Sequence, residues 1–585
     1  MQLYKYVALV LLCPLLWGTG AYALSLDAVL NSDFGEVGFA IARQGDKNCE
    51  GLKTVPVKKR GSKKHISGPA ELKGKDTEYI LTADIVAPGT AFVISASNVT
   101  LNLNGHRVVY NEETNESAGI LLKKWRLRDV SIVNGEIVQG SAGGVGNAHG
   151  KGANPIRTLS FDGVELAGLR ITYRGDSLSG VYIYENGHNF YFHHNEIIDN
   201  GTVVSNRHQG VPVVRAHGDN ARIEHNVIRD ARQIGIRVNG KAAQIKNNEV
   251  HLLSSVTNST GITSGSGEIA FNKVIGKGVH PIGIWPGKNA KVYSNYVETQ
   301  NTHRGREFGS SGSACMRFGW GGGNGLECYG NTFVVKAKEA FFDNQKRKRD
   351  ESDSWGRALF VGLKKGQTAY FHHNIIVGVN SGGSAKAAAV GLVFNNMSDG
   401  MVFENNVIAS NWGNLLLGDL YGDAGGHSLF RNNRIVKLDG GTNYHTIRSL
   451  YHVRLSTARL SGNIYEGGAS PDDYDLFTRG KAIKELAVCK DVPVKLGCPI
   501  DKDAVITATF LDSQKNVLWT ESVLRKNMVV AVPYKLLTNK RDGQLHSGPL
   551  QEIAPDNWSI ELRAGKSAMA IPLSRVGETI EFSCN

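Results

Sequence analysis

Arginine and aromatic side chains recur at one position in a series of short, β-rich segments. The segments are GVYIYENG, VPVVRAHG, IGIRVNG, GITSGSG and IGIWPG, between residues 180 and 287. If they stack as neighbouring strands about 4.8 Å apart, Tyr184, Arg215, Arg237, Thr263 and Trp285 form one outward column. Aromatic faces stack on sugar rings, and arginine forks fit the paired oxygens of a carboxylate or sulfate. The column therefore predicts a surface that binds an anionic sugar chain.

Residues suited to proton transfer lie in and beside this column. β-Elimination of a uronic-acid chain needs a base for the proton α to the carboxylate, cations for the enolate-like intermediate, and an acid for the leaving oxygen. Arg215 and Arg237 are candidates for neutralising the carboxylate, and His217, Lys241 or Tyr184 for exchanging the proton. These five are the predicted catalytic residues. The alternative for each is a solvated side chain on an exposed strand.

The segments around these strands supply further basic and aromatic groups. His208 and His280 precede two of the strands, and a later strand carries Arg317 and Trp320. Insertions in repeat proteins tend to line the binding face. The predicted substrate-binding residues are therefore Trp285, His208, His280, Arg317 and Trp320.

A repeat of asparagine followed by apolar residues positions these strands. It occurs at Asn226, Asn248, Asn272 and Asn295, at intervals of 22, 24 and 23 residues, and also at Asn195, Asn331, Asn374, Asn406, Asn433 and Asn463. Asparagine tolerates left-handed backbone and can stack on its counterpart in the next turn. Near-constant spacing with no amphipathic helical stretch predicts an all-β solenoid with one coil per repeat.

These repeats, with the segment YILTADIVAPGTAFVISASNVTLNLNGHRVV from Tyr79 to Val109, resemble the right-handed parallel β-helix proteins of the pectin-lyase-like superfamily. The resemblance covers about two thirds of the chain, and it implies the fold more specifically than the activity. It also implies that the strand before the asparagine strand forms the floor of a substrate groove. In lyases of this fold a basic side chain often serves as base, sometimes with Ca²⁺ held by acidic residues.

The resemblance and the patterning define the expected domains. Residues 1–23 read as a cleavable export signal, because Lys5 precedes an apolar run and Ala21-Tyr22-Ala23 supplies a small-x-small site. Residues 24–75 are expected to be a basic or capping segment, 76–485 the right-handed parallel β-helix, and 500–585 a small antiparallel β-sandwich-like domain. A secreted or periplasmic location follows, without membrane insertion.

The net charge indicates what kind of partner the protein binds, and the cysteine count indicates whether disulfides can form. The chain has 66 Lys and Arg against 54 Asp and Glu, a formal net charge of +12. Outside the cytoplasm a basic protein is expected to meet uronic-acid or sulfated glycans, anionic lipid headgroups or extracellular DNA, and charge alone does not choose among them. With the predicted column, an anionic polysaccharide is the expected partner, and no nucleic acid is expected. The even number of cysteines after the signal permits disulfides, and the suggested pairs are Cys489 with Cys498 and Cys315 with Cys328. The sequence leaves the oligomeric state open.

Several reaction classes remain open. A glycosidase normally needs two carboxylates, which the outward columns lack, and the superfamily's hydrolase motifs are absent. Uronate epimerases share the proton abstraction, but their DPHD-type motif is missing. The sequence thus favours a polysaccharide lyase, with a non-catalytic glycan-binding surface or matrix protein or adhesin as the main alternative. No metal site or cofactor is predicted, although the resemblance makes Ca²⁺ possible.

Overall fold

The computed structural model describes residues 24–582 apart from 32–48, 124–125, 145, 147–150, 176–177, 184–186, 202–210, 255–258, 279, 302–312, 320–322, 338–354, 364–366, 382–385, 393–399, 418–427, 442, 450–457, 477–484, 498–505, 512, 516, 524–528, 539–550, 553–557 and 565–566.

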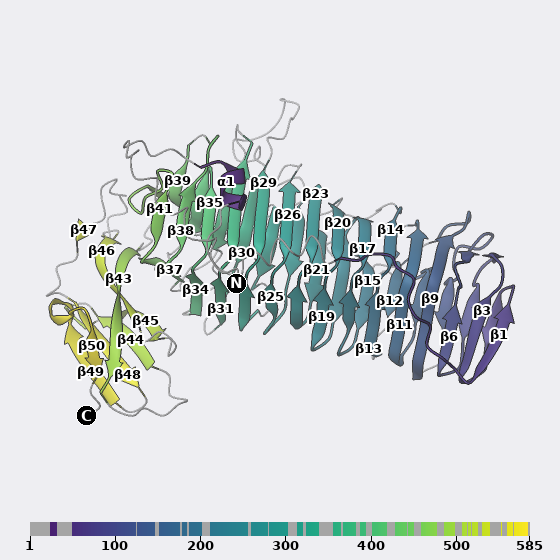
Figure 1. The fold of residues 1–585 in the computed structure, drawn as a ribbon. Coiled ribbons are helices and arrows are strands. Elements are labelled where there is room, and N and C mark those ends of the chain that lie inside the picture. Colours follow the sequence, from purple (N-terminus) through teal and green to yellow (C-terminus); the bar gives the residue numbers. More distant parts are fainter. Residues whose placement is uncertain are drawn as a thin grey trace, which may run out of the picture.

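The chain winds into a long stack of coils, each built from short strands. β15 (Pro212–His217), β16 (Arg222–Glu224) and β17 (Val227–Ala231) form one coil, and β18 (Ile234–Asn239), β19 (Ala243–Lys246) and β20 (Glu249–Ser254) form the next. Each strand pairs in parallel with its counterpart in the next coil. The result is an elongated all-β stack compatible with a parallel β-helix (Figure 1).

One side of the stack is a 15-stranded parallel sheet. Besides β15 and β18 it contains β2 (Ala70–Leu72), β5 (Phe92–Ile94), β8 (Ile120–Leu122), β10 (Ile156–Thr158), β12 (Val181–Ile183), β21 (Ser259–Ser264), β24 (Pro281–Trp285), β27 (Ser313–Phe318), β30 (Trp355–Val361), β33 (Lys386–Leu392), β36 (Gly413–Leu417), β39 (His445–Ser449) and β42 (Tyr474–Leu476).

The other sides form a 31-stranded sheet that bends at the repeat asparagines. Before the bend lie β13 (Gly187–His193), β16, β19, β22 (Gly267–Ala270), β25 (Lys291–Tyr293), β28 (Leu326–Tyr329), β31 (Thr368–His372), β34 (Gly400–Glu404), β37 (Ser428–Arg431) and β40 (Ala458–Ser461). After it lie β14 (Glu196–Asp199), β17, β20, β23 (Lys273–Gly278), β26 (Tyr296–Asn301), β29 (Thr332–Ala337), β32 (Ile375–Asn380), β35 (Val407–Ser410), β38 (Arg434–Lys437) and β41 (Ile464–Glu466).

The repeat asparagines form a continuous buried ladder along the bend. The side-chain oxygen of each accepts hydrogen bonds from the backbone N–H and side-chain amide of the asparagine one coil earlier, as Asn272 does from Asn248 at 3.0 and 2.9 Å. The ladder continues in this way from Asn195 to Asn463. Since a buried amide without partners is costly, this chain of bonds explains why every coil from Asn195 to Asn463 has asparagine there.

Alternating apolar residues fill the inside of the stack. Val181, Val214, Ile236 and Ile284 belong to one continuous buried core. Period-two alternation thus directs the residues between them outward.

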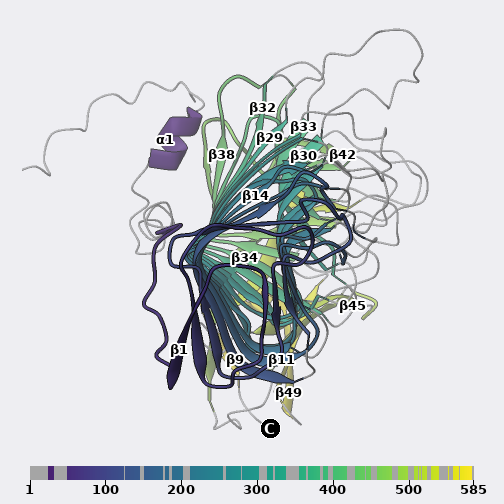
Figure 2. The same cartoon turned by 90° about the vertical axis from the view of Figure 1, so that its right-hand side faces the viewer.

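The N-terminal part lies along the outside of the stack. β1 (Ser62–Ile66) and β2 pair with β3 (Thr77–Leu81) and β5, so the coils begin before residue 76. Further back, α1 (Leu26–Asn31) packs Val29 against Val377, Ala409 and Val436 of β32, β35 and β38. Figure 2 places α1 and the segment leading to β1 on the side away from β30 and β33.

Antiparallel pairing begins where the stack ends. β43 (Glu485–Leu496) pairs in parallel with β40 and in antiparallel with β46 (Val529–Thr538). Beyond it, β44 (Ile506–Leu511), β45 (Val517–Val523), β48 (Ser559–Ala564) and β49 (Ser567–Pro572) form a four-stranded antiparallel sheet.

The suggested pairing of Cys315 with Cys328 is wrong. Both thiols are free and buried. Cys315 lies on β27 and Cys328 on β28, which belong to different sheets and are therefore not hydrogen-bonded neighbours. Cys489 is also free, and Cys498 lies outside the described residues.

Among the described residues, no helix has the length and apolar character required to cross a bilayer.

Candidate functional site

A column of outward side chains crosses the 15-stranded sheet, and we call it the arginine face. The strand pairings align Tyr182 with Arg215, Arg215 with Arg237, Arg237 with Thr263, and Thr263 with Trp285. The column extends to Arg157 at one end and to Arg317 and Phe360 at the other. Four of the five predicted column residues are thus brought together as expected.

The fifth position differs from the prediction. Val181 pairs with Val214, which places Tyr182, rather than Tyr184, beside Arg215. The Arg215 guanidinium lies 5.4 Å from the Tyr182 ring centroid. Alternation has a period of two, so it fixes which face a residue occupies but leaves a two-residue slip between strands undetermined. Tyr184 itself lies outside the described residues.

Two arginines stand directly beside each other at the centre of the face. Arg215 and Arg237 are register partners, and both are half-buried. Burial, together with the charge of Arg215, lowers the pKa of Arg237 to about 10. An anion bound between them would relieve this repulsion, because it supplies the opposite charge to both.

His217 lies on the same strand as Arg215 and contacts it. The Nε of Arg215 donates to His217 Nε2 at 2.8 Å, so this nitrogen is an acceptor and the ring proton of a neutral imidazole sits on Nδ1. His217 pairs with Asn239 in the next coil.

A second cluster of aromatic and basic groups follows along the face. The Arg317 guanidinium lies 4.7 Å from the centroid of the Trp285 ring and 5.7 Å from that of Phe360. Burial, with a contribution from Arg357, lowers the pKa of Arg317 to about 10. Trp285 and Arg317, both predicted substrate-binding residues, are therefore in direct contact.

Sequence reasoning missed the contributions of Arg157, Tyr182 and Phe360. Arg157 is half-buried beside Tyr182, and burial lowers the pKa of its guanidinium. Its coil has Leu169 where the next coil has Asn195, so the repeat offered no asparagine from which to align it. For the tyrosine position, the sequence alignment placed Tyr184 beside Arg215, two residues beyond Tyr182, which the structure places there.

The remaining predicted residues are not gathered on the face. Lys241 is exposed in the turn after β18, where its backbone N–H donates to the Asp219 carboxylate at 2.7 Å. His280 is only 2% exposed in the turn before β24. His208 and Trp320 lie outside the described residues.

The arginine face carries no acidic side chain from Arg157 to Phe360 among its eight described positions. The described residues do include one cluster with metal-ligating groups, Glu50, His194 and His225, but these belong to the N-terminal segment and the 31-stranded sheet.

Comparisons of the chain with protein-family models, with curated proteins and with solved structures found no match.

Proposed function

We propose that the arginine face binds an anionic polysaccharide. The observation that carries the proposal is the alignment of Arg157, Arg215, Arg237 and Arg317 in one outward column with Tyr182 and Trp285. Arginine forks bind carboxylates or sulfates in two-point contacts, while aromatic faces stack on the apolar faces of sugar rings. A linear polyanion lying along the coils would meet both kinds of group in turn.

We further propose that the bound chain is cleaved by β-elimination between Arg215 and Arg237. Arg215 holds the uronate carboxylate, and Arg237 removes the proton from the carbon α to it. The electron pair of that C–H bond forms the new double bond as the C–O bond at the β carbon breaks. Arg237 then returns its proton to the departing oxygen. An arginine can act as a base only in its neutral form, which is a small fraction at neutral pH even with the pKa of Arg237 lowered to about 10. Elimination by this route should therefore speed up as the pH rises toward 10.

The absence of carboxylates from the described part of the face favours elimination over hydrolysis, which normally uses two acids flanking the bond. Epimerisation would begin with the same proton abstraction and return the proton to the opposite face of the sugar.

The assigned fold and location complete the proposal. We propose a right-handed parallel β-helix of the pectin-lyase-like kind, exported through the 1–23 signal to the periplasm or beyond. The antiparallel strands after β43 would cap its last coil, because they cover an edge that otherwise exposes unpaired backbone groups.

The test is incubation of the purified protein with alginate, pectate, glycosaminoglycans and bacterial exopolysaccharides. Cleavage would appear as ultraviolet absorbance of a new double bond together with shortened chains. Binding should weaken steeply with added salt, because exposed charge contacts are screened. If none of these polyanions binds at low salt, the proposed function fails.

A non-catalytic glycan-binding protein is the second candidate. The hydrogen bond from Arg215 to His217 favours it, because it occupies the nitrogen with which His217 would accept a proton. Salt-sensitive binding with neither a new double bond nor shortened chains would establish this function instead.

A further inference from the structure

The turn before each ladder asparagine holds one residue in the left-handed backbone region. His194 and His225 occupy it in successive coils with φ of 53° and 57°, and the residues at this position in later coils include Asn247, Phe271, Ser294, His373, Asn405 and Asn432. Asparagine and glycine adopt this conformation most readily. The position accepts several residue types, so the two consecutive imidazoles are informative because of the side chains that they meet.

Three side chains with metal-ligating atoms meet at these turns. The rings of His194 and His225 stack with centroids 4.9 Å apart and planes 12° apart. Glu50 reaches them from the N-terminal segment, with its Oε2 3.4 Å from His194 Nε2. One ligand atom from each of the three lies within 4.8 Å of the others, and the described residues contain no second group of this kind.

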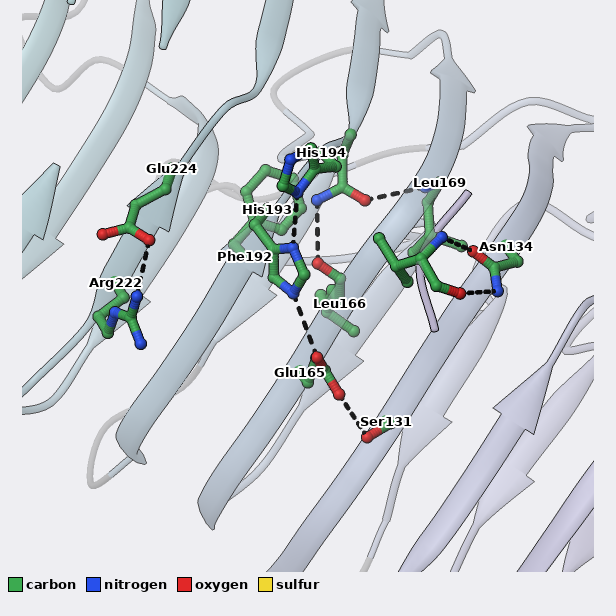
Figure 3. Close-up of polar contacts among 12 residues, drawn as sticks. Ser131, Asn134, Glu165, Leu166, Leu169, Phe192, His193, His194, Arg222 and Glu224 are labelled. Carbon is green, nitrogen blue, oxygen red and sulfur yellow. Dashed lines mark hydrogen bonds and ion pairs between the residues drawn. The ribbon is translucent and has the colours of Figure 1, made fainter. Parts of the chain in front are cut away.

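A chain of hydrogen bonds orients His194 from behind (Figure 3). Ser131 Oγ donates to Glu165 at 2.8 Å, and the other oxygen of Glu165 lies 3.1 Å from His193 Nε2. His193 Nδ1 in turn lies 2.8 Å from His194 Nδ1. In the tautomer that can bind a metal through Nε2, His194 donates its Nδ1–H to His193, and His193 donates its Nε2–H to the Glu165 carboxylate. This leaves the lone pair of His194 on Nε2, facing Glu50.

A metal ion bound to His194 Nε2 would take the place of the proton that this ring otherwise shares with Glu50, whose Oε2 lies 3.4 Å away. A carboxylate that fixes the orientation of a metal-ligating imidazole from behind is a common arrangement, here extended through a second imidazole.

We propose that Glu50, His194 and His225 bind a divalent cation of the zinc class. Two imidazoles and a carboxylate suit zinc, whose ligand atoms lie about 2.0–2.2 Å from the ion and leave a fourth position for water. Tilting of the two rings and rotation of the exposed Glu50 side chain bring the ligand atoms to that distance. The ion ties the N-terminal segment to two coils.

Lys53 competes with this ion for the Glu50 carboxylate. Its ammonium lies 2.7 Å from Glu50, and both side chains are exposed. Exposed pairs of this kind are weak, so a divalent cation displaces the ammonium. Lys53→Ala should therefore bind the metal at least as tightly as the unmodified chain.

The chain contains a matched control. Phe192-His193-His194-Asn195 recurs as Phe371-His372-His373-Asn374, with a similar 2.9 Å approach between the two Nδ1 atoms. At the next turn, however, Asn405 stands where His225 stands, and no described carboxylate completes a metal-ligating group there. His373→Asn should leave metal binding unchanged.

The experiment titrates the full exported chain, without a histidine tag, with Zn²⁺ by calorimetry and with Co²⁺ by visible absorption. We expect one ion per chain and an increase in the unfolding temperature on binding. His194→Asn, His225→Asn and Glu50→Gln should each weaken binding by at least about 100-fold, while Glu165→Gln should cost roughly 10- to 100-fold. Asparagine is a residue that other coils use at this turn, so these variants should fold.

Equal binding by the unmodified chain and His194→Asn would overturn the proposal, as would stoichiometric binding lost only in His373→Asn. Absence of binding would overturn it too, provided the chain shows its normal unfolding transition. The site lies on the 31-stranded sheet, so either result leaves the proposed glycan function to be judged by its own assay.

Discussion

Arg215 and Arg237 are register partners on neighbouring parallel strands, so two half-buried cations stand side by side on the arginine face. Like charges directly opposite each other destabilise a sheet, and burial adds to the cost of keeping them charged. Burial and the charge of Arg215 lower the pKa of Arg237, which reflects the cost of keeping both groups charged. Such an arrangement is useful where an anion is to be bound, since the ligand removes the repulsion.

The first prediction separates binding from stability. Arg237→Met keeps an unbranched stem but removes the guanidinium and its charge. It should leave the free energy of unfolding unchanged or raise it by up to about 1 kcal/mol, because the opposed charges disappear. Affinity for an anionic polysaccharide should fall about 10-fold or more, the cost of a lost charged hydrogen bond. Chemical denaturation and calorimetric titration measure the two effects.

Arg222→Met is the control for this substitution. Arg222 is exposed on β16 of the other sheet, where it pairs with Glu224 at 2.9 Å. Its replacement should not alter glycan affinity. If both variants weaken binding equally, net charge rather than the arginine face is responsible.

The second prediction concerns the contact between Trp285 and Arg317. Their separation of 4.7 Å places the guanidinium over the indole ring. A double-mutant cycle with Trp285→Leu and Arg317→Met should give a coupling energy of about 0.5–2 kcal/mol in unfolding free energy. Trp285→Leu alone should also weaken glycan binding, because a flat aromatic surface is lost. Additive effects of the two substitutions on stability would show that the contact contributes nothing.

A third prediction tests the asparagine ladder. Asn272 is fully buried, and its side-chain amide donates to Ile245, Ala270 and Asn295. Asn272→Ala should lower the free energy of unfolding by about 3 kcal/mol or more, because it strands several buried backbone groups. Asn239→Ala, at an exposed position, should change it by no more than about 0.5 kcal/mol. Similar losses in the two variants would contradict a special role for the ladder.

The stack could be predicted from the sequence because the strongest sequence signal, the repeat asparagine, is also the residue that links successive coils. Each repeat asparagine must satisfy a fixed set of buried hydrogen bonds, so its spacing reports the length of the coil directly. The same anchor correctly aligned Arg215, Arg237, Thr263 and Trp285.

Where that anchor was missing or the constraint was weaker, prediction failed. In the coil of Arg157, Leu169 stands in place of the repeat asparagine, so the coil could not be aligned and Arg157 was not assigned to the column. For the next coil, alternation alone did not distinguish Tyr182 from Tyr184. The meeting of Glu50 with His194 and His225 was beyond sequence reasoning, because it depends on where the N-terminal segment crosses coils more than 140 residues later.

The last prediction concerns acid stability and His372. This ring stacks on Tyr329 and Tyr370, with centroids 5.1 and 4.3 Å away, and it faces His373, Glu327 and Glu404. Burial, reinforced by His373 and only partly offset by the two carboxylates, lowers its pKa from 6.5 to about 4.

The sign of the effect on stability follows from proton uptake. Below pH 6.5 the unfolded chain protonates this imidazole, whereas the folded chain does so only near pH 4. The free energy of unfolding should therefore fall as the pH drops from 6.5 to 4, by on the order of 1–3 kcal/mol from this group. His372→Phe keeps an aromatic ring in the stack but cannot be protonated, so its stability should fall less over that range. Urea denaturation at a series of pH values measures the difference. Parallel pH profiles for the two proteins would mean that the His372 ring is protonated equally in both states, and that its burial between the two tyrosines carries no electrostatic cost.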